Sequence, residues 1–274
     1  MSKSSNTTQS LGTLSIGNVV SAGLRIYRDH FKLYYTQALI SYFWLFVPVY
    51  GWAKFSAIQG LIARLAFHEV IERPETIHEA RQQVQPRMWN FLVAGFLVFL
   101  IVFASVIIGA IIFGLFALIL GLIFASAFQD NQIILGIVGF IFGIIAFFIF
   151  MFGYIWIFSR LSIVELPIAI ESQSDASFAI NRSWKLTKGS VLRLQLIFFV
   201  AFLVTLPLSL IINFASLLIP SDSPIYLIFN LVISILVGAL VIPFWQTIKA
   251  VVYYDLRSRK EGLGLEIKDS LSDD

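Results

Sequence analysis

Residue types that perform catalysis are scarce in this chain, and none of them stands at a diagnostic spacing. The closest match to a zinc-protease motif is the stretch from His68 to Glu72, HEVIE, but that motif needs a second histidine one helical turn after the first, and position 72 is a glutamate. The other histidines, His30 and His78, lie far apart in the sequence. No nucleophile elbow, phosphate-binding loop or dinucleotide-binding turn occurs, and cysteine is absent. The sequence therefore predicts no enzyme activity, no metal site and no cofactor.

Uncharged polar residues inside apolar segments form a second group that could do chemistry. Asn213 and Asn230 lie in the last two long apolar segments, together with Gln195 and Gln246. These segments hold no carboxylate, although transporters that couple to protons or cations usually carry one within the membrane. The four residues either form a polar pathway between two helices or hydrogen-bond one helix to the other. Both interpretations stay open.

The composition identifies the elements that must position these residues as membrane helices. The chain has 274 residues, of which 58% are hydrophobic and only 13% charged. A soluble domain carries about 25% charged residues. Uncharged stretches occupy residues 33–53, 88–129, 131–159, 194–221 and 223–248. Each is long enough to cross a hydrocarbon core of about 30 Å at about 1.5 Å per residue, so the sequence predicts an all-α integral membrane protein.

The basic residues set the expected topology. Of the 19 Lys and Arg residues, all except Lys54 fall in four blocks, at 3–32, 64–87, 160–193 and 249–268. By the positive-inside rule these blocks face the cytoplasm, and an even number of crossings separates successive blocks. The simplest arrangement is three helical hairpins, which make a six-helix bundle with both termini in the cytoplasm.

The expected organisation is a single membrane domain over residues 15–260, with a flexible polar tail at 1–14 and a flexible acidic tail at 261–274. The first ten residues contain one Lys and no apolar core, so no signal peptide is indicated. The six spans are expected at about 33–52, 53–72, 89–125, 132–159, 192–219 and 225–252.

Arg64 interrupts the second expected span. It lies about 15 Å along a helix from Lys54, and an ionisable group at that depth is a candidate functional residue because burying it in lipid is costly. In one interpretation its side chain extends toward the cytoplasm or pairs with His68 or Glu69. In the other, residues 55–87 form a surface helix and do not cross the membrane.

The third expected span is too long for one simple crossing. As a single helix, residues 88–129 would extend about 63 Å, twice the thickness of the hydrocarbon core. A hairpin would use this length, but it would move the next basic block and the C-terminus outside. We therefore expect one long helix that is bent or broken near Gly109 or Gly114. Small residues at helical spacing, Ala117 and Gly121 here and Gly139 and Gly143 in the next span, predict close helix packing.

Three shorter helices are expected on the cytoplasmic side. Residues 15–31 place apolar side chains on one face, which predicts an interfacial helix along the inner leaflet. Thr76 and Glu79 fit a capping box that starts a short helix ending near Pro86. A third helix is expected to start after Ser174 or Asp175, to run to about residue 188 and to end at Gly189 in a left-handed turn.

Basic and aromatic side chains gather around this third helix and the end of the last span. We define the predicted rim by these residues: Arg182, Trp184, Lys185, Lys188, Arg193, Asp255 and Arg257. One interpretation is a surface that binds anionic lipid headgroups or a protein partner. The other is that these residues only orient the chain and seat the helix. No nucleic-acid partner is expected, and the sequence does not determine the oligomeric state.

Three stretches carry a resemblance to a known family: residues 16–31 (IGNVVSAGLRIYRDHF), 179–189 (AINRSWKLTKG) and 250–267 (AVVYYDLRSRKEGLGLEI). Together they resemble bacterial multi-pass membrane proteins related to the glycerophosphoryl diester phosphodiesterase membrane domain. The resemblance implies a six-helix bundle in the bacterial cytoplasmic membrane with cytoplasmic termini. In fused members the phosphodiesterase activity belongs to a separate barrel, typically about 250 residues long, which is not expected here. The resemblance therefore implies a fold and not an activity.

Two functions follow as hypotheses. The first is a non-enzymatic membrane protein that organises or assists other membrane proteins or lipids, through the predicted rim. The second is a transporter or lipid-handling protein with a polar site around Asn213 and Asn230. Membrane lipids, including anionic ones, are the expected partners in both cases, with other membrane proteins as further partners in the first.

Overall fold

The computed structural model of the protein describes residues 14–127, 132–173, 175–216 and 223–263. Within these ranges the chain is helical and contains no β-strand. The helices, one of them the 3₁₀-helix η1, are α1 (Ile16–Asp29), α2 (Phe31–Trp44), α3 (Tyr50–Val70), α4 (Ile77–Val84), η1 (Gln85–Arg87), α5 (Met88–Ala127), α6 (Gln132–Leu161), α7 (Glu165–Ile170), α8 (Ala176–Thr187), α9 (Val191–Ser216) and α10 (Pro224–Glu261).

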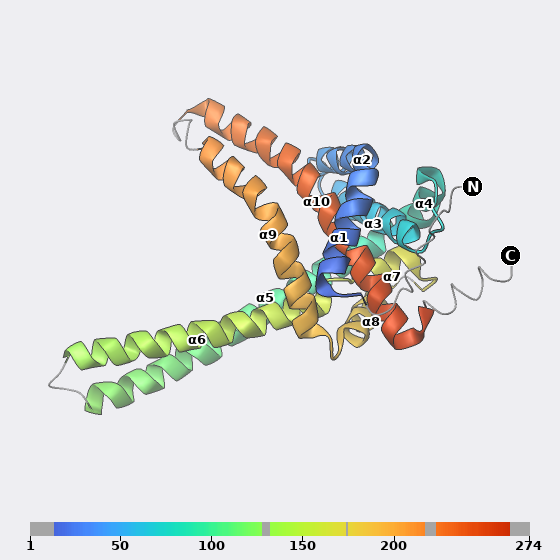
Figure 1. Ribbon diagram of the computed structural model, residues 1–274. Coiled ribbons are helices and arrows are strands. Elements are labelled where there is room, and N and C mark those ends of the chain that lie inside the picture. Colours follow the sequence, from blue (N-terminus) through green and yellow to red (C-terminus); the bar gives the residue numbers. More distant parts are fainter. Residues whose placement is uncertain (1–13, 128–131, 174, 217–222, 264–274) are drawn as a thin grey trace, which may run out of the picture.

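Two long helical hairpins leave a common base and diverge from each other (Figure 1). We call the α5–α6 and α9–α10 hairpins the two arms. The base consists of α1, α2, α3, α4, η1, α7 and α8 with the ends of the four arm helices. In the described part of the chain, the four arm helices are the ones long and apolar enough to cross a membrane. The all-α class and the membrane-spanning character of these helices are therefore as the sequence predicts.

The base holds the packed core. Helix α3 lies at its centre, where it contacts α10, α2, α5, α7 and α4. Tyr34, Ile62, Leu166, Ile248 and Tyr253 are fully buried there. The arms differ, because most of their large apolar side chains are exposed and have no protein neighbour to cover them. The base is therefore the part of the protein in which side chains can be positioned against one another.

Helix α5 is continuous from Met88 to Ala127. The expected single long helix is therefore confirmed over residues 88–127, without a hairpin, and it is not broken at Gly109 or Gly114. At Gly109 a Cβ atom would lie 2.5 Å from Cε2 of Phe150, so this glycine serves the approach of α6. A Cβ atom at Gly121 or Gly139 would have no neighbour within 4 Å, so the expected close packing does not occur at these small residues.

The first two expected spans divide at a different place. The turn lies between α2 and α3, around Pro48, whereas the sequence places the boundary at residues 52 and 53. Proline lacks the amide hydrogen that continues a helix, and Val49 adopts a φ of 59°. At Gly51 a Cβ atom would lie 1.8 Å from the carbonyl oxygen of Trp44, so only glycine fits the close approach of the two helices here. Helix α2 has 14 residues, or about 21 Å, and is shorter than a hydrocarbon core of about 30 Å.

Helix α1 forms as expected, but its apolar face packs against the protein. Val19 and Gly23 are buried, and a Cβ atom at Gly23 would lie 2.5 Å from Cδ1 of Ile248 in α10. The hydroxyl of Tyr27 donates a hydrogen bond of 2.9 Å to the carbonyl oxygen of Leu240, also in α10. The periodicity that predicts a helix along the inner leaflet therefore serves tertiary packing.

The expected helix ends are local features and agree with the sequence. The amide of Thr76 donates to Glu79 Oε2 at 2.8 Å, and the amide of Glu79 donates to Thr76 Oγ1 at 3.3 Å, which completes the capping box of α4. The hydroxyl of Thr76 also donates to Glu79 Oε2 at 2.8 Å, and the hydrogen bonds that the Glu79 carboxylate accepts from the Thr76 amide and hydroxyl lower its pKa. Asp175 occupies the N-cap position of α8 without a side-chain capping hydrogen bond, and Gly189 follows the helix with a φ of +79°. Ser174 lies outside the described residues.

Candidate functional site

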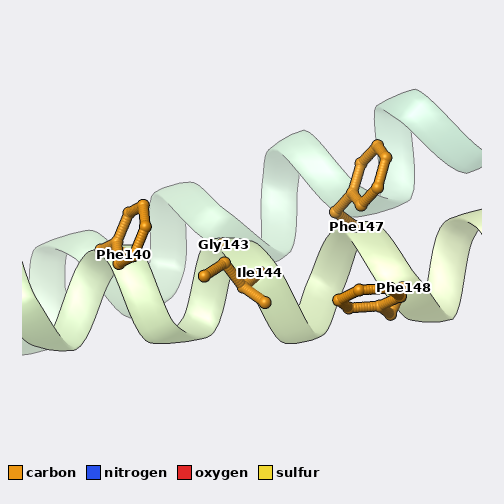
Figure 2. A pocket seen from close by; sticks show the side chains of 5 residues that line it. All are labelled: Phe140, Gly143, Ile144, Phe147 and Phe148. Carbon is orange, nitrogen blue, oxygen red and sulfur yellow. The ribbon is translucent and has the colours of Figure 1, made fainter.

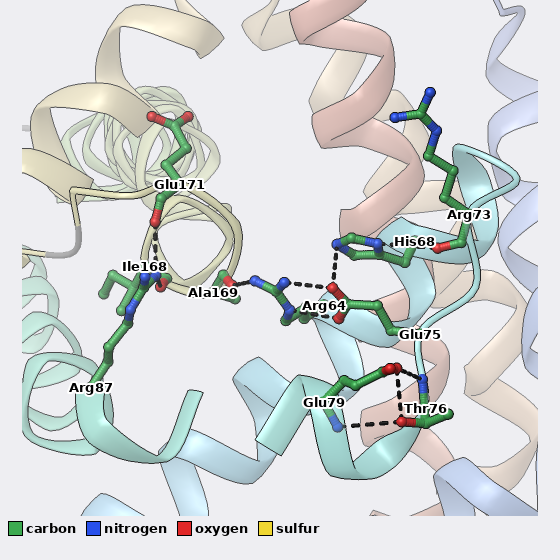
Figure 3. A network of polar contacts seen from close by, with 10 residues as sticks. All are labelled: Arg64, His68, Arg73, Glu75, Thr76, Glu79, Arg87, Ile168, Ala169 and Glu171. Atoms are coloured by element: carbon green, nitrogen blue, oxygen red, sulfur yellow. Dashed lines mark hydrogen bonds and ion pairs between the residues drawn. The ribbon is translucent and has the colours of Figure 1, made fainter. Parts of the chain in front are cut away.

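Arg64 stands at the centre of the first polar group in the base. It lies in α3, and 9% of its surface is exposed. Its guanidinium donates from Nε to Glu75 Oε2 at 2.7 Å, from Nη2 to Glu75 Oε1 at 2.6 Å, and from Nη1 to the carbonyl oxygen of Ala169 at 2.7 Å (Figure 3). His68 Nε2 lies 3.3 Å from Glu75 Oε1. The expected pairing of Arg64 with His68 or Glu69 is therefore corrected, since the carboxylate partner comes from the loop after α3.

A turn at the end of α3 makes this pairing possible. Glu72 has a φ of 57°, and the amide of Arg73 donates to the carbonyl oxygen of His68 at 3.0 Å. The chain thereby reverses and brings Glu75 back alongside α3. A partner that depends on a chain reversal is not visible in a helical spacing rule, which considers only residues one turn apart.

Two arginines hold the carboxyl end of α7. Arg87 Nη1 donates to the carbonyl oxygens of Ile168 at 2.9 Å and Glu171 at 2.7 Å, next to the Ala169 oxygen that Arg64 binds (Figure 3). The last carbonyls of a helix lack partners within the helix and carry partial negative charge, so cations are favourable there. The two arginines therefore tie α3 and η1 to α7.

A second polar group joins the loop after α7 to the end of α10. Arg182 Nε donates to Glu171 Oε1 at 2.8 Å, and Arg182 Nη2 donates to Glu261 Oε2 at 2.8 Å. The hydroxyl of Tyr253 also donates to Glu171, and Arg257 Nε donates to Glu261 Oε2 at 3.0 Å. Burial lowers the pKa of Arg182, but the two carboxylates outweigh burial and raise that pKa above its usual value. Arg182 is therefore a constant positive link between these segments.

Asp255 forms a third group near the start of the described chain. It is 5% exposed and accepts hydrogen bonds from Arg259 Nε at 3.1 and 3.0 Å. Arg193 Nη1 lies 2.9 Å from Asp255 Oδ2, and the amide of Leu14 donates to Asp255 Oδ1 at 3.3 Å. This carboxylate therefore joins α10 to α9 and to the residues that precede α1.

Most charges of the predicted rim are paired within the protein. Arg182, Arg193, Asp255 and Arg257 all belong to the ion pairs above. Lys185 is exposed, and its backbone oxygen accepts a hydrogen bond of 2.9 Å from Lys260 Nζ. The surface that these residues offer to a lipid headgroup is consequently smaller than the sequence suggests.

The remaining rim residues lie around α8. Lys188 is exposed, and its backbone oxygen also accepts from Lys260 Nζ, at 2.7 Å. Trp184 packs edge-on against Trp156, and the guanidinium carbon of Arg160 lies 4.9 Å from the centre of each ring. The aromatic member of the predicted rim therefore holds α8 against the end of α6.

The two asparagines of the second hypothesis lie in the α9–α10 arm. Asn230 is half-buried, and its Nδ2 donates to the carbonyl oxygen of Tyr226 in its own helix at 2.9 Å. Asn213 belongs to α9, and its side chain lies outside the described residues.

A partly open cavity of about 240 Å³ lies where the arms meet the base. We call it the Gln59–Gln246 cavity. It is lined by Phe55, Ser56, Gln59, Phe91, Ala94, Gly95, Val98, Leu161, Val164, Glu165, Ile168, Gln246 and Lys249. Helices α3, α5, α6, α7 and α10 and the turn before α7 contribute these residues, so the cavity exists only in the folded protein.

Four side chains that line the cavity determine which hydrogen bonds a ligand could make there. Lys249 Nζ donates to Glu165 Oε1 at 2.6 Å, which makes an ion pair of no net charge. Gln59 and Gln246 are 8% and 6% exposed, and the Oε1 atom of each accepts no hydrogen bond from the described residues. The sequence singles out Gln246 among these four, because it lies in an apolar segment. Gln59, Glu165 and Lys249 lie near the ends of expected spans and carry no comparable signal.

A larger hollow on the outer face of α6 is purely apolar. Its volume is about 490 Å³, and Phe140, Gly143, Ile144, Phe147 and Phe148 line it (Figure 2). Gly143 lies between the rings of Phe140 and Phe147 along the helix (Figure 2). This hollow offers no polar side chain that would select a ligand, so the smaller polar cavity is the better candidate site.

Within the described ranges, no three His, Asp or Glu side chains are arranged to hold a metal ion. No family model, no curated protein and no solved structure matches the chain. The family resemblance therefore stays a prediction.

Proposed function

We propose that this protein organises or assists other components of the bacterial cytoplasmic membrane and is not itself an enzyme. The observation that carries the proposal is the pair of diverging arms (Figure 1). Their apolar side chains are uncovered; Phe103 in α5 and Phe202 in α9 are examples, at 52% and 48% exposed. Such surfaces are suited to lipid chains and to the helices of other membrane proteins. Most charged side chains of the base are paired with one another, which supports the proposal that the base holds the arms in a fixed arrangement.

The proposed topology keeps six spans, which are the four arm helices and the α2–α3 pair, and it puts the rest of the base in the cytoplasm. Every described basic residue except Lys54 belongs to one of the four blocks that the positive-inside rule assigns to the cytoplasm. The α2–α3 pair is the remaining hairpin of this proposal, and its turn exposes Phe43 and Phe46, at 65% and 62%. Because α2 is short, the turn would have to lie at the outer edge of a locally thinned bilayer.

Cysteine accessibility tests this topology, and the chain offers a clean background because it contains no cysteine. Single cysteines would replace Lys54, Asp130, Lys185 and Ser270 in turn. A membrane-impermeant maleimide applied to intact cells should label positions 54 and 130 but leave positions 185 and 270 unlabelled. Labelling at position 185 from outside would overturn the topology, and protection at position 54 would reduce the protein to four spans.

Photo-crosslinking tests the organising role. A photoreactive phenylalanine analogue would replace Phe103 or Phe202 in the arms, with Gln83 in α4 as the exposed control position in the base. We expect one discrete membrane-protein adduct at both arm positions and none at the control. Adducts with lipid alone at both arm positions would refute the organising role and favour lipid handling.

A lipid-handling or transport function is the second candidate, and the specific observation that favours it is the Gln59–Gln246 cavity. For this second candidate we propose the polar site between α3, α5, α7 and α10 rather than around Asn213 and Asn230. Flux or lipid transfer would be measured in reconstituted vesicles. Activity that survives in Asn213→Leu and Asn230→Leu but is lost in Gln246→Met would support the cavity as the site.

A further inference from the structure

We propose that the Gln59–Gln246 cavity is a binding site for the head of a lipid that carries hydrogen-bond donors. This inference concerns binding alone, and it holds whether the protein organises partners or moves lipid. The chemical class is an uncharged or zwitterionic amphiphile whose head carries a hydroxyl or a primary ammonium group.

Gln59 lines the cavity, and its orientation leaves its amide oxygen as an acceptor without a protein partner. The hydroxyl of Ser41 donates to the carbonyl oxygen of Ala38 at 2.6 Å, so the Ser41 oxygen can only accept from Gln59. Gln59 Nε2 makes that hydrogen bond at 3.0 Å. Its amide cannot be turned round without losing this contact, and its Oε1 is left as a buried acceptor without a protein partner.

Gln246, which lines the cavity from a different helix, supplies a second acceptor. It comes from α10, whereas Gln59 comes from α3, and its Oε1 is also buried without a partner among the described residues. An unsatisfied buried acceptor costs about 1–3 kcal/mol, so two of them at one cavity are expected to be satisfied by something that enters it. That occupant must offer N–H or O–H groups.

Charge restricts the occupant further. The ion pair between Lys249 and Glu165 has no net charge, and side-chain exposures of 23% and 22% leave both groups within reach of the cavity. The cavity therefore offers no surplus cation to a strongly anionic head. A hydroxyl or an ammonium group can donate to the two glutamine oxygens and to the Glu165 carboxylate, and a hydroxyl can also accept from Lys249.

The apolar lining points to a lipid rather than to a polar metabolite. Phe91 and Val98 line the cavity from the first turns of α5, roughly 5–15 Å along that helix from its start. In the proposed topology α5 enters the bilayer at its start, which puts the cavity near the boundary between headgroups and acyl chains. Phe55 and Leu161 add further apolar surface. A volume of about 240 Å³ holds a headgroup and the first methylenes of a chain, and the rest of the chain would continue into the bilayer.

The test compares lipids that share their acyl chains and differ in the hydrogen-bond donors on their heads. The full-length protein would be reconstituted in phosphatidylcholine, which has no N–H or O–H group on its head, and phosphatidylethanolamine or diacylglycerol with the same chains would be added. We expect native mass spectrometry to show retention of one donor-bearing lipid with a preference over phosphatidylcholine of about fivefold for one hydrogen bond and about 25-fold for two. Retention of phosphatidylethanolamine alone identifies an ammonium group as the donor that the cavity binds, and retention of diacylglycerol alone identifies a hydroxyl.

Variants separate a ligand role from a structural one. Gln246→Met and Gln59→Met remove the acceptors at similar volume, and Gln195→Met in α9, outside the cavity lining, is the matched control. We expect each cavity variant to lower the preference by about fivefold, which is the contribution of one hydrogen bond. The unfolding temperature of Gln246→Met in phosphatidylcholine should stay equal or rise because a buried unsatisfied group is removed, whereas Gln59→Met also loses the hydrogen bond to Ser41 and should unfold at a slightly lower temperature. The control should keep the preference. Equal retention of all lipids by the wild type, or an unchanged preference in both cavity variants, would overturn the proposal.

Discussion

Replacing Arg64 with methionine removes the cation from a largely buried ion pair of the base. The side chains of Arg64 and Glu75 are 11% and 18% exposed, and the pair is held by two hydrogen bonds. The substitution leaves the Glu75 carboxylate and the Ala169 carbonyl oxygen without this donor. Breaking a buried pair from one side costs about 3–5 kcal/mol, and because Glu75 keeps some contact with solvent we expect about 3 kcal/mol. At about 2–4 °C per kcal/mol, the unfolding temperature should fall by about 6–12 °C.

A double-mutant cycle distinguishes a lost pair from lost packing. The Arg64→Met/Glu75→Gln protein has no unpaired charge, so it should recover at least half of the stability that Arg64→Met loses. The assay is thermal unfolding in one detergent, followed by intrinsic fluorescence. Arg28→Met is the control, because Arg28 and Asp29 form a pair with side-chain exposures of 76% and 48%. Exposed pairs contribute about 0–1 kcal/mol, so this variant should change little.

Two outcomes would refute the reasoning. The first is an Arg64→Met protein that is no less stable than Arg28→Met. The second is a double mutant whose loss equals the sum of the two single losses, since the two side chains would then act independently.

Three further variants test local features of the fold in the same unfolding assay. Gly51→Ala should be strongly destabilising because its Cβ would overlap the carbonyl oxygen of Trp44. Gly95→Ala is the control: no atom lies within 4 Å of a Cβ there, so this change should be neutral or stabilising by up to about 1 kcal/mol. Equal effects of the two substitutions would contradict the close approach of Gly51 to Trp44. Thr76→Ala should cost about 1 kcal/mol through the lost cap of α4, and no change would show that the cap is dispensable. Glu79→Ala should lower the stability of the protein at neutral pH, and progressively less below the ordinary glutamate pKa of 4.5. Folding lowers the pKa of this carboxyl, so the carboxylate stabilises the folded protein above pH 4.5 and loses that contribution as it becomes protonated. A stability difference between Glu79→Ala and the wild type that persists at acid pH would exclude the charged cap.

Local features of this protein follow from the sequence. The capping box of Thr76 and Glu79 and the left-handed residue Gly189 depend on residues a few positions apart, and the structure has both where they are expected. Four of the five long uncharged segments likewise become the four long helices, because a chain in an apolar solvent must satisfy its backbone hydrogen bonds within each segment. Helix existence and most helix ends are therefore determined at short range.

Other features were decided by the tertiary structure. Glu75 reaches Arg64 through a chain reversal. Glu165 in α7 pairs with Lys249, which lies far along the chain in α10. The apolar face of α1 packs on α10. The turn around Pro48 moves the boundary of the first two expected spans, since a break can fall at several places in an apolar segment. Sequence periodicity identifies the apolar face of a helix and the charged residues on it, but it does not identify the groups that they contact. Which carboxylate an arginine meets, and which glutamine oxygens are left facing a cavity, depends on how separate helices pack.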